Sequence, residues 1–142
     1  MAVLLEKNFP VEAGAFTTAG EASTTIKRTL KQLGVGAEVL CRVSVACYEV
    51  ELNLVIHSLG GKLILEVDEK GVWLTSEDVG PGIQDISLAM REGYSTANEE
   101  ARSLVFGAGM GLPNMKRNAD DFEIESELGK GTRIRMRFAL SA

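Results

Sequence analysis

The sequence predicts an α+β fold: a two-layer sandwich in which helices cover one face of a mainly antiparallel sheet. Two pairs of strand-like runs, each joined by a short turn that contains glycine, lie at residues 62–76 and 121–140. Helix-like segments precede the first pair and separate the two pairs. Strands joined by tight turns are antiparallel, and helices between such pairs pack on one face of the sheet. With 142 residues, we expect a single domain over residues 1–142.

The N-terminal part is expected to form an edge strand and two helices. Residues 8–18 have the composition of a strand and turn, and Pro10 is tolerated only at a sheet edge. Apolar residues recur at helical spacing over Glu21–Leu33, and two nearby glycines end that helix. Ala37–His57 is the strongest helical pattern, with one apolar stripe formed by Leu40, Val43, Cys47, Val50 and Leu54.

The rest of the chain supplies four strands and a third helix. A third helix is expected over Met110–Ala119, and a short helix over 85–93. The last two strands alternate between apolar and polar residues, which is typical of strands with one buried face. The expected strands are Lys62–Asp68, Val72–Ser76, Asp121–Glu127 and Arg133–Leu140.

Composition and charge exclude several classes of function. The net charge of −5 argues against nucleic-acid binding, which needs a basic surface. No signal peptide and no apolar run of membrane-spanning length is present, so we expect a cytoplasmic protein without a membrane partner. Cys41 and Cys47 are poorly spaced for a disulfide and are interpreted as small core residues, and His57 cannot form a zinc site with them.

Two glycine clusters, at residues 78–83 and 107–112, flank a polar segment with no clear period. Closely spaced glycines let the backbone approach a ligand, and long loops in compact domains are usually functional, so a ligand beneath a movable flap is expected. The second cluster lacks the GxGxxG spacing of dinucleotide-binding sites. It leads into a helix, whose free N–H groups suit phosphate, although a tight turn is the commoner role of such glycines.

Three polar residues are candidates for chemistry. Asp78 follows an apolar strand, where its carboxylate could accept from the exocyclic amine of adenine or could simply start a turn. Glu49 and Asn53 lie one turn apart on the long helix. A glutamate there can take a proton and an asparagine oxygen suits Mg²⁺, but a solvated polar stripe is the commoner alternative.

These motifs, in this order and spacing, resemble those of the Bergerat-fold (GHKL) ATPases, the superfamily of gyrase B, Hsp90, histidine kinases and MutL. The motifs are Glu49-x-x-x-Asn53-x-x-x-His57, Asp78-x-Gly80-x-Gly82-Ile83, Gly107-x-Gly109-x-Gly111-Leu112 and Gly131-Thr132. Within the superfamily, the chain is most similar to the small anti-sigma-factor serine/threonine kinases of sporulation and stress-response partner switching. Similarity at 79–86, 92–96 and 109–117 carries this second resemblance.

The resemblance implies a role for each residue. Glu49 would be the general base, Asn53 would coordinate Mg²⁺, and Asp78 would bind the adenine amine with Thr132 supporting the pocket. The adenine pocket would also include Gly80, Gly82 and Ile83. Residues 94–106 would form the ATP lid, with Arg102 as a candidate cation for the terminal phosphate. The phosphate-binding segment would comprise Gly107, Gly109, Met110, Gly111 and Leu112.

The implied function is an ATP- and Mg²⁺-dependent protein serine/threonine kinase. Its substrate would be a STAS-domain antagonist protein, and it would bind a sigma factor or another regulator. Two alternatives stay open: a non-catalytic, nucleotide-dependent module that sequesters a regulator, and an ATPase or histidine kinase fragment. The apolar lid end, Leu104–Phe106, favours a protein partner. The sheet face near residues 9–16 is a candidate surface for a homodimer.

Overall fold

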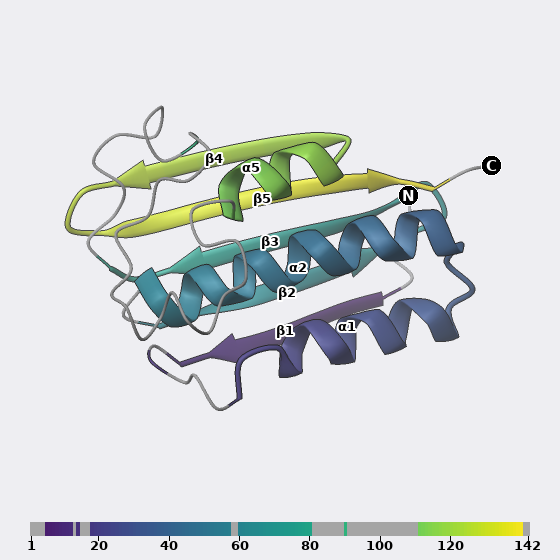
Figure 1. Ribbon diagram of the computed structural model, residues 1–142, viewed down its shortest axis with the longest axis horizontal. Helices are drawn as coiled ribbons and strands as arrows, with labels where there is room; N and C mark the ends of the chain where they lie inside the picture. Colours follow the sequence, from purple (N-terminus) through teal and green to yellow (C-terminus); the bar gives the residue numbers. More distant parts are fainter. Residues whose placement is uncertain are drawn as a thin grey trace.

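The computed structural model describes residues 5–12, 14, 18–57, 60–80, 90 and 111–140, and structural statements below concern these residues. They form a two-layer α+β sandwich, with three helices in front of a five-stranded sheet in Figure 1. The α+β prediction is therefore confirmed. The short helix expected over 85–93 and the lid at 94–106 lie almost entirely outside the described residues.

The sheet is antiparallel throughout, in the order β1-β2-β3-β5-β4. β3 (Gly71–Asp78) is its central strand and pairs with β2 and β5. The other strands are β1 (Leu5–Val11), β2 (Gly61–Val67), β4 (Asp121–Glu127) and β5 (Gly131–Ala139). Only β1 differs much from the prediction, since it starts earlier than residue 8 and ends at Val11. Pro10 does lie on an edge strand, as expected.

Three helices cover one face of this sheet: α1 (Glu21–Gln32), α2 (Ala37–His57) and α5 (Gly111–Asn118). The bounds of α2 match the prediction, those of α1 differ by one residue at the C-terminal end, and those of α5 differ by one residue at each end. In the part of the chain that is described, no helix is long and apolar enough to cross a membrane. α2 lies between α1 and α5 in Figure 1, so it contacts both other helices as well as the sheet.

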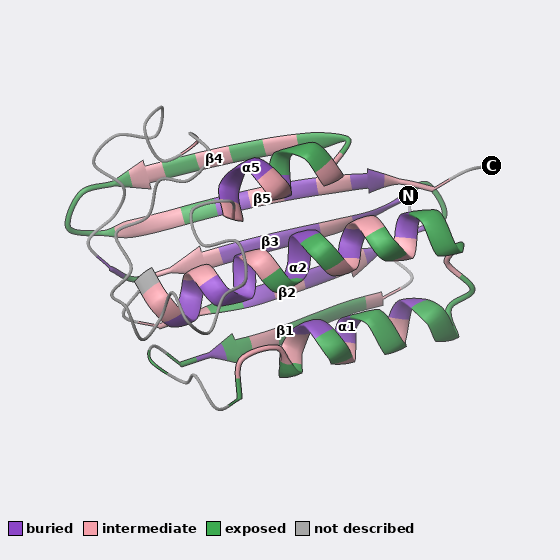
Figure 2. Ribbon diagram, viewed as in Figure 1, coloured by how far each residue is buried: buried purple, intermediate pink, exposed green. Residues whose placement is uncertain are grey.

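The core lies between the two layers, and its largest buried side chains come from β2, β3, β5, α1, α2 and α5. Figure 2 shows buried segments along β2, β3 and β5 and on all three helices. The fully buried residues include Phe138, Met136, Leu74, Leu65, Ile26, Val43 and Met115.

The expectation that both cysteines lie in the core is wrong for Cys41. Cys41 is exposed, whereas Cys47 is buried. Six residues along a helix turn the side chain by roughly 240°, so Cys41 cannot share the core face on which Val43 and Cys47 lie. Phe9 packs partly buried against the core, because it shares a face of β1 with buried Val11. The homodimer surface expected near residues 9–16 stays a prediction, since residues 13 and 15–17 lie outside the described part of the chain.

Candidate functional site

The expected site residues that the structure describes lie toward one end of the sandwich. The C-terminal half of α2, the start of α5, the end of β3 and the start of β5 all lie toward the left of Figure 1. Those described are Glu49, Asn53, Asp78, Gly80, Gly111, Leu112 and Thr132. The others lie outside the described residues: Gly82, Ile83, Arg102, Gly107, Gly109 and Met110.

Glu49 and Asn53 face the N-terminal turn of α5. A Cβ built on Gly111 would lie 3.3 Å from Glu49 Oε2 and 3.6 Å from Asn53 Oδ1. Glycine at this position therefore lets the first turn of α5 approach both side chains closely. Asn114, one turn along α5, donates from Nδ2 to Glu49 Oε1 at 3.3 Å. The carboxylate of Glu49 and the amide oxygen of Asn53 therefore both lie beside the N-terminus of α5.

The Glu49 carboxyl is partly removed from water in this position. Burial raises its pKa above the usual value for glutamate, and the hydrogen bond from Asn114 opposes part of this rise. A carboxylate with a raised pKa is a better proton acceptor near neutral pH than an ordinary surface glutamate. The geometry and the electrostatics therefore both suit a general base.

Asp78 is tied to the start of β5. The backbone N–H of Thr132 donates to Asp78 Oδ1 at 2.9 Å. A Cβ on Gly131 would overlap the Asp78 carbonyl oxygen and lie 3.0 Å from its Oδ1, and Gly131 has a φ of 147°, which favours glycine. Glycine at position 131 therefore lets the start of β5 lie close to the end of β3, where the Thr132 N–H reaches the Asp78 carboxylate.

The surroundings of Asp78 are fixed by further hydrogen bonds. Gly80 N donates to the Lys130 carbonyl at 3.3 Å, which joins the first glycine cluster to the turn between β4 and β5. The hydroxyl oxygens of Thr132 and Ser126 are 2.9 Å apart. Burial raises the pKa of Asp78, and the backbone N–H of Thr132 opposes that rise. Asp78 is therefore a half-buried acceptor held in place by backbone groups.

Leu112 lies in the hydrophobic core, and the residue is only 7% exposed. Only its backbone can face a ligand, so the side chain anchors the start of α5 to the core.

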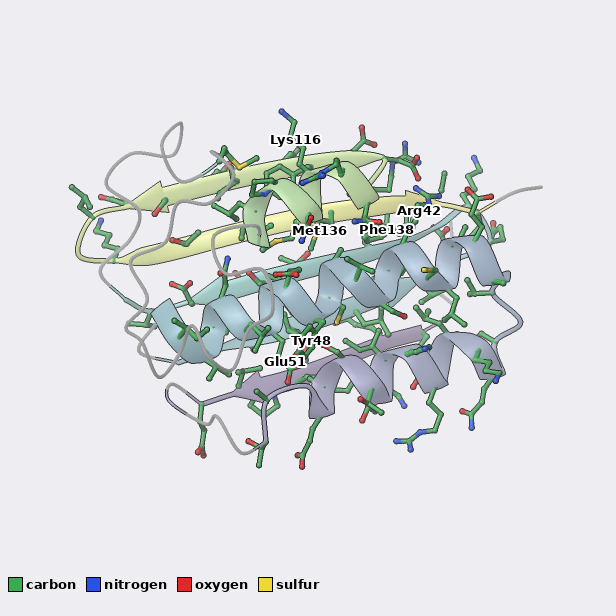
Figure 3. All side chains as sticks on the ribbon, viewed as in Figure 1. Arg42, Tyr48, Glu51, Lys116, Met136 and Phe138 are labelled. Atoms are coloured by element: carbon green, nitrogen blue, oxygen red, sulfur yellow. The ribbon has the colours of Figure 1, made fainter. Side chains whose placement is uncertain are left out.

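The structure adds a buried carboxylate that the sequence analysis missed. Glu51 is 3% exposed and accepts hydrogen bonds from the α1 backbone, from Ser23 N at 2.9 Å and from Ala22 N at 3.2 Å. The Ser23 hydroxyl donates to the same carboxylate at 2.6 Å. Figure 3 shows Glu51 on the side of α2 toward α1. Because Gly20 offers no capping side chain, Glu51 serves as the cap of α1.

α5 is attached to α2 at its other end as well. Arg42 Nη1 donates to the carbonyl of Asn118 at 3.2 Å and lies 3.4 Å from Asp120 Oδ2. A cation at this end also suits the negative pole of the helix dipole. α2 therefore holds both ends of α5, with Glu49 near its start and Arg42 at its end.

This arrangement fits a nucleotide with a divalent cation. Asp78 offers an oxygen acceptor suited to an exocyclic amine. The start of α5 offers N–H groups and the positive end of a dipole to phosphate, where Gly111 lacks a Cβ that would fill the space. The amide oxygen of Asn53 is the kind of hard ligand that Mg²⁺ prefers.

Comparisons with known proteins agree with this fit. Residues 42–142 match the family described as histidine kinase-, DNA gyrase B-, and HSP90-like ATPase. Among curated proteins, the chain is 34% identical over 112 residues to the serine/threonine-protein kinase RsbT of Bacillus subtilis (strain 168), covering 76% of this chain and 78% of that protein. It is 34% identical over 120 residues to the anti-sigma F factor of Thermoanaerobacter sp. (strain X514), covering 81% and 80%.

A solved structure supports the fold alone. The chain matches one in the crystal structure of the SiaB–SiaC complex from Pseudomonas aeruginosa with a TM-score of 0.60 and 14% sequence identity. The match covers 96% of this chain and 89% of the other.

Proposed function

The chain belongs to the histidine kinase-, DNA gyrase B-, and HSP90-like ATPase family, and we propose that it is an ATP-dependent serine/threonine protein kinase of the anti-sigma type. The observation that carries the proposal is the Glu49 carboxylate, held by Asn114 beside the start of α5. Phosphoryl transfer depends mainly on positioning and charge stabilisation, and this contact supports a role for Glu49 as the proton acceptor beside the proposed phosphate site.

In the proposed reaction, Asp78 holds the adenine amine and the N-terminal turn of α5 holds the phosphates. Glu49 accepts the proton of a serine or threonine hydroxyl on the substrate protein. The hydroxyl oxygen forms a bond to the γ-phosphorus while the bond from that phosphorus to the β–γ bridging oxygen breaks, and ADP leaves. Asn53 would hold Mg²⁺, which neutralises phosphate charge when bound.

We further propose that the substrate is a STAS-domain antagonist protein. Support comes from the relatives, which carry the names serine/threonine-protein kinase and anti-sigma F factor. The second name also supports a binding role, in which the nucleotide-loaded chain sequesters a sigma factor or another regulator. The two roles are compatible, because phosphorylation of the antagonist can change which partner the kinase holds. Such a kinase would work in the cytoplasm, where ATP and these partners are present.

The test is transfer of labelled γ-phosphate from ATP to purified STAS-domain proteins of the same organism. We expect acid-stable phosphoserine or phosphothreonine with the wild-type chain, and a loss of about 100-fold or more with Glu49→Gln, since a general base typically contributes that much. Tight nucleotide binding without transfer to any acceptor would favour the sequestering module. Steady ATP turnover without an acceptor would favour an ATPase.

A further inference from the structure

The first turn of α5 lies close to the Glu49 carboxylate and donates a hydrogen bond to it. Asn114 Nδ2 donates to Oε1 at 3.3 Å, and a Cβ added at Gly111 would lie 3.3 Å from Oε2. A glutamate side chain has three rotatable bonds, so a hydrogen bond to its carboxylate restricts its orientation. We propose that Asn114 is a positioning residue that holds Glu49 ready to accept the substrate proton. This inference rests on the proposed kinase function.

Asn114 can serve this purpose because its own helix is fixed. The Asn118 side chain donates from Nδ2 to the Asn114 carbonyl at 2.8 Å, one turn along α5. Arg42 of α2 donates to the carbonyl of Asn118. Leu112 and Met115 pack in the core on either side of Asn114 in the sequence. The amide is therefore presented from a helix that the core and α2 hold in place.

A neutral donor suits a carboxylate that must work as a base. A lysine or arginine at this position would form an ion pair and strongly favour the ionised, weakly basic carboxylate. The Asn114 amide orients Glu49 but lowers its pKa less than a cation would, so burial still leaves the pKa of Glu49 raised. Asn114 also lies near Gly111 at the start of α5, so the donor to Glu49 and the proposed phosphate-binding turn belong to one helix.

The pH dependence of the reaction gives a readout that a structural role would not change. Glu49 acts in its ionised form, so the transfer rate rises with pH through the pKa of Glu49. Without the Asn114 donor, nothing from this residue opposes the effect of burial, so the pKa of Glu49 rises further. The low-pH side of the rate profile (the acid limb) then moves to higher pH. Asn114→Leu removes the donor at similar size, and Asn114→Asp replaces it with a second carboxylate, which moves the limb in the same direction and further.

The experiment combines single-turnover phosphotransfer with direct titration of Glu49. The acceptor is the STAS-domain protein that the wild-type chain phosphorylates fastest, and the titration follows the ¹³C carboxyl resonance of Glu49. For Asn114→Leu we expect about tenfold slower transfer at neutral pH, an unchanged half-saturating ATP concentration and a higher pKa of Glu49. Asn8→Leu, the same substitution at an exposed position of β1, should keep the wild-type pKa and acid limb.

Different results would overturn different parts of the account. An unchanged Glu49 titration in both Asn114 variants, or an equal shift in Asn8→Leu, would overturn the role of Asn114 while leaving the kinase intact. A wild-type chain that phosphorylates no acceptor would overturn the proposed function instead, since the titration of Glu49 needs no acceptor.

Discussion

The stability of the helix layer should depend on Glu51. This buried carboxylate of α2 accepts three hydrogen bonds from the first turn of α1, from Ala22 N, Ser23 N and the Ser23 hydroxyl. Glu51→Ala would leave two backbone N–H groups without that acceptor. We therefore expect α1 to lose its cap and its link to α2, although the fold should persist because the core side chains are unchanged.

The magnitude follows from the groups left behind. A buried donor without an acceptor costs about 1–3 kcal/mol, and Glu51→Ala leaves the two backbone donors of Ala22 and Ser23 without theirs. Part of this loss of stability is offset, because the variant no longer has to desolvate the Glu51 carboxylate, which costs several kcal/mol. We expect Glu51→Ala to lower the free energy of unfolding by about 3 kcal/mol. Glu51→Gln, which keeps one acceptor oxygen, should lose about half as much.

Urea unfolding followed by far-UV circular dichroism measures this change as a lower midpoint at constant slope. Glu38→Ala is the matched control on the same helix, because the Glu38 side chain is 89% exposed and lies 3.9 Å from Arg42. Its effect should stay below about 0.5 kcal/mol. The reasoning would be refuted if Glu51→Ala unfolded at the same urea concentration as Glu38→Ala.

Two further predictions concern the thiols and the start of β5. Cys41 is exposed, whereas burial and, less strongly, the nearby Glu51 carboxylate raise the pKa of the Cys47 thiol to about 12. A thiol reagent should therefore modify only Cys41 in the native protein and both cysteines in urea; rapid native labelling of Cys47 would contradict this. Gly131→Ala should displace Asp78 and weaken ATP binding, measured by calorimetry. Gly129→Ala is the matched control, since Gly129 also has a positive φ, of 79°, but a Cβ there meets no atom within 4 Å. Equal losses of ATP binding in the two variants would argue against a special role for Gly131.

Most of the fold could be predicted because its elements carry strong local signals. The α2 stripe fixed the bounds of that helix, and the alternation in β4 and β5 identified their buried faces. Cys41 was assigned wrongly because a residue type was given more weight than its angular position on the helix. The start of β1 was missed because Leu5–Lys7 has no turn signal before it.

The site could be predicted in part. Glu49, Asn53 and Asp78 stood out through their spacing in ordered motifs, although their roles remain predictions. Glu51 carried a signal that was overlooked, because it continues the spacing of the buried stripe from Val43 and Cys47. Asn114 carried none, since its contact with Glu49 joins two helices that are 65 residues apart in the chain.

The most direct test of the central claim is single-turnover phosphotransfer measured over a range of ATP concentrations. The account assigns binding to Asp78 and chemistry to Glu49, at two places in one site. Asp78→Asn should raise the half-saturating ATP concentration about tenfold or more, since it loses a charge-assisted hydrogen bond, while keeping much of the maximal rate. Glu49→Gln should bind ATP as the wild type does and transfer almost no phosphate. Wild-type transfer by Glu49→Gln, or unchanged ATP dependence in Asp78→Asn, would contradict the account.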